Sequence, residues 1–183
     1  MILETNAFRS ELASWSVPGL LQPVDDELLQ QYVELISEDP RSLFRERAAG
    51  HFTSSALLVD PRAGQVLLLM HPRVGRWLQF GGHIELADAC FAAAALRECR
   101  EESGYRDIQI SQTPVALDRH PVPCSGGSSV HWDIQFLASV DKDSLQVETE
   151  NLQVKWFDMT RVTHEIPDLD PSVRRLVAAA VAM

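Results

Sequence analysis

The feature that most constrains this chain is a helical segment with three closely spaced glutamates near its end. Residues 90–103 read CFAAAALRECREES, and the alanine-rich start favours an α-helix. Glu98, Glu101 and Glu102 stand at positions i, i+3 and i+4, so at about 100° per residue they share one helical face. Like charges this close repel one another. The pattern therefore indicates a cation site, and ligands that are all oxygen favour Mg²⁺ or Mn²⁺ over zinc.

A second interpretation of the same helix is a solvated charged end, with Arg97 and Arg100 forming ion pairs with the glutamates. The residues before the helix favour a binding site. Gly81 and Gly82 end a short apolar run, and paired glycines let the backbone approach a ligand or metal closely. A strand, a double glycine, an acidic loop and a helix with clustered carboxylates together form the plan of a compact site.

Two residues are predicted to delimit this helix. Asp88 suits an N-cap, because its short carboxylate accepts a hydrogen bond from a first-turn N–H. Gly104 suits the position after the last helical residue, where a left-handed conformation is common. We therefore predict that Asp88 starts the helix and binds no metal directly.

Short apolar segments surround the helix and predict a sheet. Residues 53–59 and 65–71 read as a β-hairpin whose strands are buried on both faces, joined by the turn-rich sequence DPRAG. Further strands are predicted at 108–117, 130–140 and 153–157, and a final amphipathic helix at 171–182. Helices and strands mix without strict alternation, so the predicted fold class is α/β or α+β with a mixed sheet.

The first fifty residues have a different character. They read as helical, with an amphipathic helix from Asp25 to Ile36, a stop at Pro40 and a short second helix over 42–48. We interpret residues 1–50 as a helical extension that serves packing or dimerisation, and residues 51–183 as the functional domain.

Composition and charge limit the kinds of partner that this chain is expected to bind. The 183 residues include 16 Lys and Arg against 26 Asp and Glu, a formal charge of −10 that disfavours general nucleic-acid binding. No apolar run is long enough to span a bilayer, and no secretory signal is visible, so we expect a cytoplasmic protein without membrane association. Three cysteines without CxxC spacing argue against a disulfide framework or a zinc site. The oligomeric state, a homodimer included, is left open.

The segment from Gly82 to Tyr105 resembles the signature of the Nudix hydrolase family, G-x5-E-x7-R-E-U-x-E-E-x-G-U, where U is apolar. Residues 97–105, RECREESGY, match its second half. Asp88 stands where glutamate is usual, and one extra residue precedes the helix. The resemblance covers about residues 51–182. It implies an α/β/α sandwich that hydrolyses a pyrophosphate bond in a nucleoside diphosphate linked to another moiety.

The resemblance also implies residue roles. Glu98 and Glu102 would bind Mg²⁺ or Mn²⁺ directly. Glu101 would be a further ligand or the base that acts on water, and the carbonyl oxygen of Gly81 would complete the metal shell. Arg97 would orient a neighbouring glutamate through a charge-assisted hydrogen bond. The metal would neutralise the diphosphate and lower the pKa of bound water.

Four residues outside the signature are candidates for substrate contact. His83 follows the double glycine and could donate to a phosphate, and Trp77 could stack on a base. His131 and Asp133 project from one face of a predicted strand that could line the substrate cleft. The alternative is structural: histidines of the surface or core, and a tryptophan that packs.

The general base and the substrate stay open. Glu148 and Glu150, just before the last predicted strand, are later candidates for the base, and the favoured alternative is a solvated acidic loop with Asp141 and Asp143. Two alternatives to hydrolysis share the scaffold. An isopentenyl-diphosphate isomerase needs a reactive cysteine, and no cysteine here sits at the matching place. A non-catalytic nucleotide sensor usually lacks the signature glutamates, which this chain keeps.

Overall fold

The structure is a computed structural model that describes residues 2–15, 23–124, 127–145 and 153–182. Its strands are β1 (His51–Asp60), β2 (Gln65–Met70), β3 (Trp77–Leu78), β4 (Phe80–His83), β5 (Gln109–Ile110), β6 (Ala116–Cys124), β7 (Gly127–Ser139) and β8 (Gln153–Asp158). Its helices are α1 (Ile2–Trp15), α2 (Pro23–Glu38), α3 (Phe91–Ser103), α4 (Val162–Glu165) and α5 (Pro171–Val181), with short 3-10 helices η1 (Pro40–Leu43) and η2 (Lys142–Ser144).

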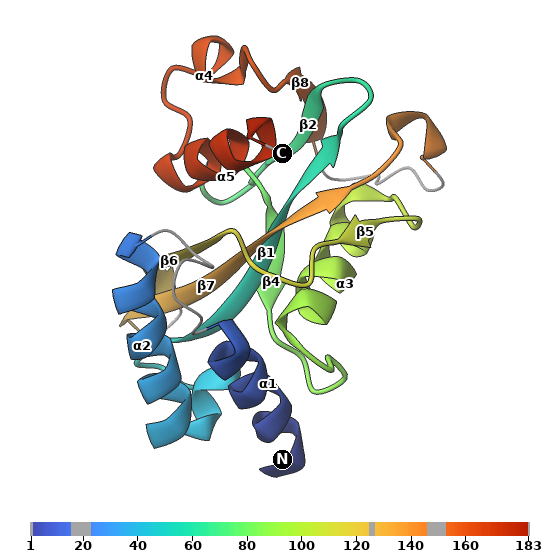
Figure 1. Cartoon of the computed structure of the whole chain (residues 1–183). Coiled ribbons are helices and arrows are strands. Elements are labelled where there is room, and N and C mark those ends of the chain that lie inside the picture. Colours follow the sequence, from blue (N-terminus) through green and yellow to red (C-terminus); the bar gives the residue numbers. More distant parts are fainter. Residues whose placement is uncertain (1, 16–22, 125–126, 146–152, 183) are drawn as a thin grey trace.

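The described strands form one mixed eight-stranded sheet. Its twisted central strands run through the middle of the molecule in Figure 1. Strands β1 and β7 lie parallel at its centre. The predicted hairpin is confirmed, since β1 pairs antiparallel with β2. Strand β4 continues along the same edge of β1, from the pair Thr53–His83 to the pair Ala56–Phe80, and β6 pairs antiparallel with β7. The first half of β1 therefore lies within a run of four neighbouring strands, β4, β1, β7 and β6.

Alternate residues of β1 face two separate cores, which explains why all ten of its residues are buried. Ala56 and Leu58 belong to the core that includes residues of α3, α1 and α2. Leu57 and Val59 belong to a second core that includes α5. Helices thus cover both faces of the sheet, and the predicted α/β/α sandwich is confirmed. At the start of β1 the face that α5 covers further along carries polar residues instead.

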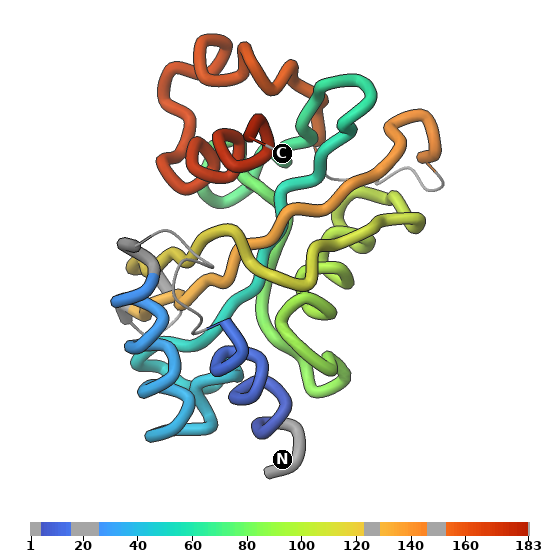
Figure 2. Tube along the Cα trace, in the orientation of Figure 1, coloured from blue at the N-terminus to red at the C-terminus, as the bar shows by residue number. Residues whose placement is uncertain are grey.

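The N-terminal helices pack into the larger of these cores. Phe8 of α1 meets Phe91 of α3 edge to face, with ring centroids 4.8 Å apart. The ring centroids of Tyr32 in α2 and Phe52 in β1 lie 5.5 Å apart, and the Tyr32 hydroxyl donates to the carbonyl oxygen of Asp118 at 2.7 Å. Figure 2 follows both helices to their place beside the sheet. Their apolar faces are therefore buried within this chain.

One predicted helix is wrong. The chain after Pro40 forms only the 3-10 helix η1, capped by Asp39, and the helix expected over 42–48 is absent. Arg47 folds back so that its Nε donates to Asp39 at 3.0 Å, which draws the segment into a compact turn. Among the described helices, none is long and apolar enough to cross a membrane.

Candidate functional site

Helix α3 begins at Phe91 and is capped from two directions. The Sγ atom of Cys90 accepts a hydrogen bond from Ala93 N–H at 3.3 Å. The carboxylate of Glu11, from α1, accepts from Phe91 N–H at 2.8 Å. A carboxylate also interacts favourably with the positive end of the helix dipole. Gly104 ends the helix in the predicted left-handed conformation, with φ 79°. Helix α1 is thereby tied to the helix that carries the glutamates.

The prediction that Asp88 caps α3 is wrong, because a charged partner holds this carboxylate elsewhere. Asp88 accepts hydrogen bonds from Nε and Nη2 of Arg97 at 3.1 and 2.9 Å, and from Glu85 N–H at 2.8 Å. Its side chain is only 5% exposed. Two bonds from a charged guanidinium hold this carboxylate more strongly than one bond from a neutral backbone N–H would. Helix α3 is uninterrupted, so the loop before it accommodates the extra residue, as predicted.

Arg97 connects the loop, the strand and the helix. Besides Asp88, its guanidinium donates to the carbonyl oxygen of His83 at 2.9 Å and to the carboxylate of Glu98 at 2.9 Å. A longer bond of 3.3 Å reaches Glu101. Such fixed charge-assisted bonds restrict the rotamers of both partners. This geometry is what a residue that orients Glu98 requires.

The double glycine gives the glutamates room to approach the strand. A Cβ on Gly82 would lie 2.4 Å from Oε1 of Glu98, and a Cβ on Gly81 would lie 2.4 Å from the Cβ of Ser55. Oε2 of Glu102 accepts from the N–H of Gly81 at 3.3 Å. Close packing therefore excludes side chains at both positions, and two carboxylates meet the glycine backbone.

The electrostatics of this corner suit a cation. Burial raises the pKa of Glu102 to about 7 despite its hydrogen bond from Gly81, and the charges of Glu98 and Glu101 add to the effect. Burial also raises the pKa of Glu98. Among the described residues, no Lys or Arg forms an ion pair with Glu102. A partly buried, all-oxygen donor pair without a cationic partner at Glu102 fits Mg²⁺ or Mn²⁺.

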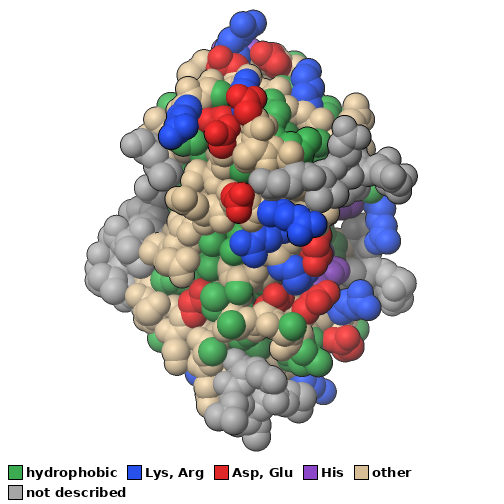
Figure 3. Space-filling view, turned by 90° about the vertical axis from the view of Figure 1, so that its right-hand side faces the viewer, with side chains coloured by type: hydrophobic (Ala, Val, Ile, Leu, Met, Phe, Trp, Pro, Cys, Tyr) green, Lys and Arg blue, Asp and Glu red, His purple; other side chains and the backbone are tan. Residues whose placement is uncertain are grey.

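Glu101 stands apart from the other two glutamates. Its side chain is 58% exposed and turns toward Arg97. In the parts of the chain that the structure describes, the three glutamates do not form a group whose ligand atoms all lie within 4.8 Å. On the face of the molecule that carries α3, acidic and basic side chains lie side by side (Figure 3). Glu98 and Glu102 are therefore the glutamates closest to the glycine backbone.

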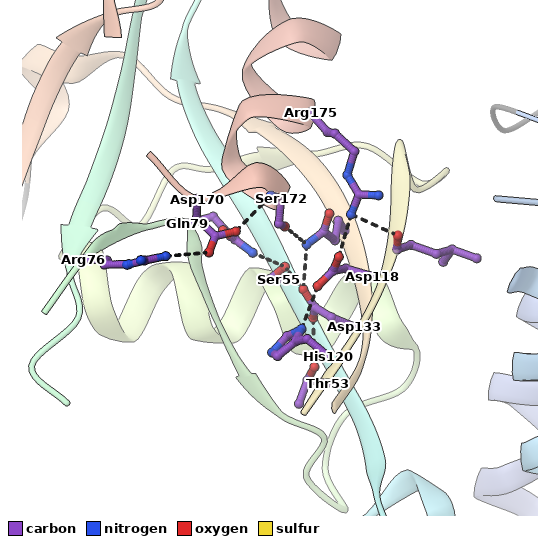
Figure 4. Close-up of polar contacts among 12 residues, drawn as sticks. Thr53, Ser55, Arg76, Gln79, Asp118, His120, Asp133, Asp170, Ser172 and Arg175 are labelled. Carbon is purple, nitrogen blue, oxygen red and sulfur yellow. Dashed lines mark hydrogen bonds and ion pairs between the residues drawn. The ribbon is translucent and has the colours of Figure 1, made fainter. Parts of the chain in front are cut away.

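On the opposite face of the sheet, a polar network surrounds Asp133 (Figure 4). Thr53 and Ser55 donate to its two carboxylate oxygens at 2.9 and 2.6 Å, and Gln135 donates at 2.9 Å. Gln135 also donates to the hydroxyl of Ser172 on α5 at 2.6 Å. Asp133 is 4% exposed, and burial raises its pKa in spite of these bonds. It lies at the centre of a buried network rather than on an open surface.

Histidines continue this polar face toward the start of β1. The ring centroids of His51 and His131 lie 5.0 Å apart, and His83 lies 5.0 and 5.5 Å from them. His120 follows, 5.6 Å from His131, with Nδ1 2.6 Å from Asp118. Burial, with the neighbouring imidazoles, lowers the pKa of His131 to about 3, whereas the bond to Asp118 raises the pKa of His120. Two residues predicted from sequence, His83 and His131, thus lie together.

The remaining candidates lie elsewhere. Trp77 packs edge to face on Phe157, with ring centroids 5.1 Å apart, against the core that includes residues of α5. This contact agrees with the alternative that Trp77 is a packing residue. Glu148 and Glu150 lie outside the described residues. Sequence reasoning missed His51 and its polar neighbours. The available signal was the alternation of His51, Thr53 and Ser55 at the start of an otherwise apolar strand.

Comparison with known proteins identifies the family. The family model described as NUDIX domain matches residues 50–180, which is most of the chain. The protein therefore belongs to the Nudix hydrolase family, and the resemblance stated above is confirmed. Residues 2–15 and 23–49, with helices α1 and α2, precede the matched region. No curated protein matches the chain.

Solved structures confirm the fold. A NUDIX-family hydrolase from Clostridium perfringens matches with a TM-score of 0.53 and 19% identity, over 73% of this chain and 98% of that chain. An Ap4A hydrolase from C. elegans matches with a TM-score of 0.51 and 18% identity, over 72% and 95%. A binary complex of the C. elegans hydrolase matches with a TM-score of 0.52 and 20% identity, over 72% of this chain and 98% of that chain. Identities this low speak for the fold alone.

Proposed function

We propose that this protein hydrolyses a pyrophosphate bond in a nucleoside diphosphate linked to another moiety, with Mg²⁺ or Mn²⁺ as cofactor. One observation carries the proposal: Glu98 and Glu102 meet the Gly81–Gly82 backbone, and Glu102 has no cationic partner among the described residues. Membership of the Nudix family supports it, because that family typically uses divalent metals.

The proposed roles follow from the contacts of each residue. Glu98, Glu102 and the carbonyl oxygen of Gly81 would hold the metal. A divalent ion at this place would neutralise phosphate charge and lower the pKa of bound water. Arg97 would orient Glu98 through its 2.9 Å bond. Glu101, exposed at the surface of the same helix, is the candidate for the general base among the described residues.

The substrate class is narrowed by chemistry rather than by similarity. The acidic chain has no excess of cations for a polyanion, so a small diphosphate that is neutralised by metal suits it better than nucleic acid. The C. elegans structure is named an Ap4A hydrolase, so Ap4A is a substrate of that protein. We include this nucleotide among the substrates to test, beside ADP-ribose, sugar nucleotides, nucleotide coenzymes and oxidised nucleotides.

The test is a hydrolysis screen of the full chain with Mg²⁺ and with Mn²⁺, in which products are identified by mass spectrometry. We expect one diphosphate class to be cleaved between its phosphorus atoms. Excess chelator should abolish turnover, and added Mg²⁺ should restore it. Glu102→Gln should lower kcat/KM by roughly 100-fold or more, while Glu34→Gln, an exposed helical control, should not. Full turnover in chelator, or metal binding without any turnover, would refute the proposal; the second result describes a sensor.

A further inference from the structure

Three histidines from three neighbouring strands converge on the sheet face opposite α3. His51, His83 and His131 each offer a ring nitrogen, and these three atoms lie within 4.8 Å of one another. Among the described residues, this is the only group of three metal-ligand side chains that meets this distance. We propose that His51, His83 and His131 bind one divalent transition-metal ion of the zinc class, at a second centre separate from the glutamates.

The sheet itself sets the spacing of these ligands. His51 of β1 is the direct partner of His131 in the parallel pairing with β7. His83 is the partner of Thr53 in the pairing of β4 with β1, so its side chain lies on the same face, one pair further along. Neighbouring strands are about 4.8 Å apart. Backbone hydrogen bonds on both sides of β1 therefore hold the three imidazoles close together.

Two buried imidazole nitrogens lack a partner. His51 is 2% exposed, and its Nδ1 lies 3.4 Å from the carbonyl oxygen of Arg47. A carbonyl only accepts, so this contact places the proton on Nδ1 and leaves a lone pair on Nε2. Within the described residues, Nε2 of His51 and Nε2 of His131 are buried without a hydrogen-bond partner. Unsatisfied buried groups are costly, and a metal ion would satisfy them.

The donor set decides the class of metal. Imidazole nitrogen suits zinc, copper, nickel and iron, whereas Mg²⁺ prefers oxygen. Three histidines leave a tetrahedral ion with one open position for water or a substrate oxygen. His120 lies next to His131 on the same face, and Asp118 holds its Nδ1 at 2.6 Å. This carboxylate–histidine pair lies where it can orient a ligand in that position.

Strand β4 contributes to both centres, but the two centres lie on opposite faces of the sheet. The carbonyl oxygen of His83 accepts from Arg97 on the α3 side at 2.9 Å, while its ring joins His51 and His131 on the other side. The two donor sets therefore share no residue, and the contact between Arg97 and the His83 backbone is what links them. This separation allows each centre to be tested alone.

The experiment uses the full chain, freed of metal by chelator and then titrated with Zn²⁺ in the presence of millimolar Mg²⁺. Bound metal is counted by elemental analysis after gel filtration, and Co²⁺ serves as a spectroscopic probe of tetrahedral nitrogen ligation. We expect one Zn²⁺ per chain. His131→Gln should weaken Zn²⁺ binding by more than roughly 100-fold. His164→Gln, an exposed histidine on α4, and Glu102→Gln should leave it unchanged.

Two results would overturn this second centre: less than stoichiometric Zn²⁺ in the wild type, or binding lost in Glu102→Gln and kept in His131→Gln. Thermal unfolding followed by circular dichroism confirms that each variant is folded. His51→Gln provides a second ligand variant. If it fails to fold because His51 is buried, the wild-type Co²⁺ spectrum decides, since octahedral oxygen ligation of Co²⁺ contradicts the proposal. Hydrolysis is not the readout, so this outcome is independent of the proposed reaction.

Discussion

The two neighbouring glycines of β4 should respond differently to the same substitution. An alanine Cβ at Gly81 would lie 2.4 Å from the Cβ and 2.7 Å from the Cα of Ser55, and 2.8 Å from the carbonyl oxygen of Ser54. These atoms belong to the central strand β1. An alanine Cβ at Gly82 would instead meet three atoms of the Glu98 carboxylate, at 2.4, 2.6 and 2.9 Å. The first clash is with the backbone of β1 and the Cβ fixed to it, and the second is with the end of a flexible side chain.

The magnitudes follow from what can move. Gly81→Ala must displace β1, and overpacking of this kind costs about 1–3 kcal/mol or more. We place it at the upper end of that range, because β1 is paired on both sides. In Gly82→Ala, the Glu98 side chain can rotate away. It then loses its 2.9 Å bond to Arg97, which lowers the free energy of unfolding by about 1 kcal/mol. The displaced carboxylate no longer faces the glycine backbone, so metal affinity should fall even though the fold persists.

Urea unfolding in chelator and Mn²⁺ titration measure the two effects separately. Gly81→Ala should lower the free energy of unfolding far more than Gly82→Ala. Gly82→Ala should fold and bind Mn²⁺ much more weakly than wild type. If Gly82→Ala retains wild-type Mn²⁺ affinity, or if the two variants are equally destabilised, the packing argument is refuted.

Three further perturbations test other contacts of the site. Asp88→Asn removes the charge that Arg97 contacts twice, so urea unfolding should show a loss of about 1.5–3 kcal/mol; an unchanged midpoint would contradict this. Glu11→Ala removes an acceptor at the start of α3 and should cost about 1 kcal/mol in the same assay. Asp118 raises the pKa of His120 above 6.5, so this pair stabilises the fold below pH 6.5 and its contribution is lost as pH rises through the folded-state pKa. In NMR titration, Asp118→Asn should lower the pKa of His120, and an unshifted titration would exclude the contact.

Local patterns predicted the parts of the fold that depend on neighbouring residues. The hairpin of β1 and β2 was predictable because a turn-rich linker joins two apolar runs. The end of α3 was predictable because glycine readily adopts the left-handed conformation found at Gly104. The face shared by Glu98 and Glu102 follows from helical spacing alone. Periodicity and turn chemistry are encoded within a few residues, so sequence reasoning reaches them.

Contacts between distant residues were out of reach. Asp88 is a residue type that often caps helices, but its actual partner, Arg97, lies nine residues further along the chain. Glu11 reaches the start of α3 from 80 residues away. The three histidines meet only because the register of β4, β1 and β7 aligns them. Strand register depends on tertiary packing, and a single sequence does not display it.

The central claim, that Glu98 and Glu102 hold a divalent cation against the Gly81–Gly82 backbone, is tested most directly by Mn²⁺ binding to chelator-treated protein. Electron paramagnetic resonance measures free Mn²⁺, and competition with Mg²⁺ selects the oxygen site. We expect Mg²⁺-displaceable Mn²⁺ binding in wild type and in Glu34→Gln, and its loss in folded Glu102→Gln. Equal binding in Glu102→Gln and wild type would contradict the account.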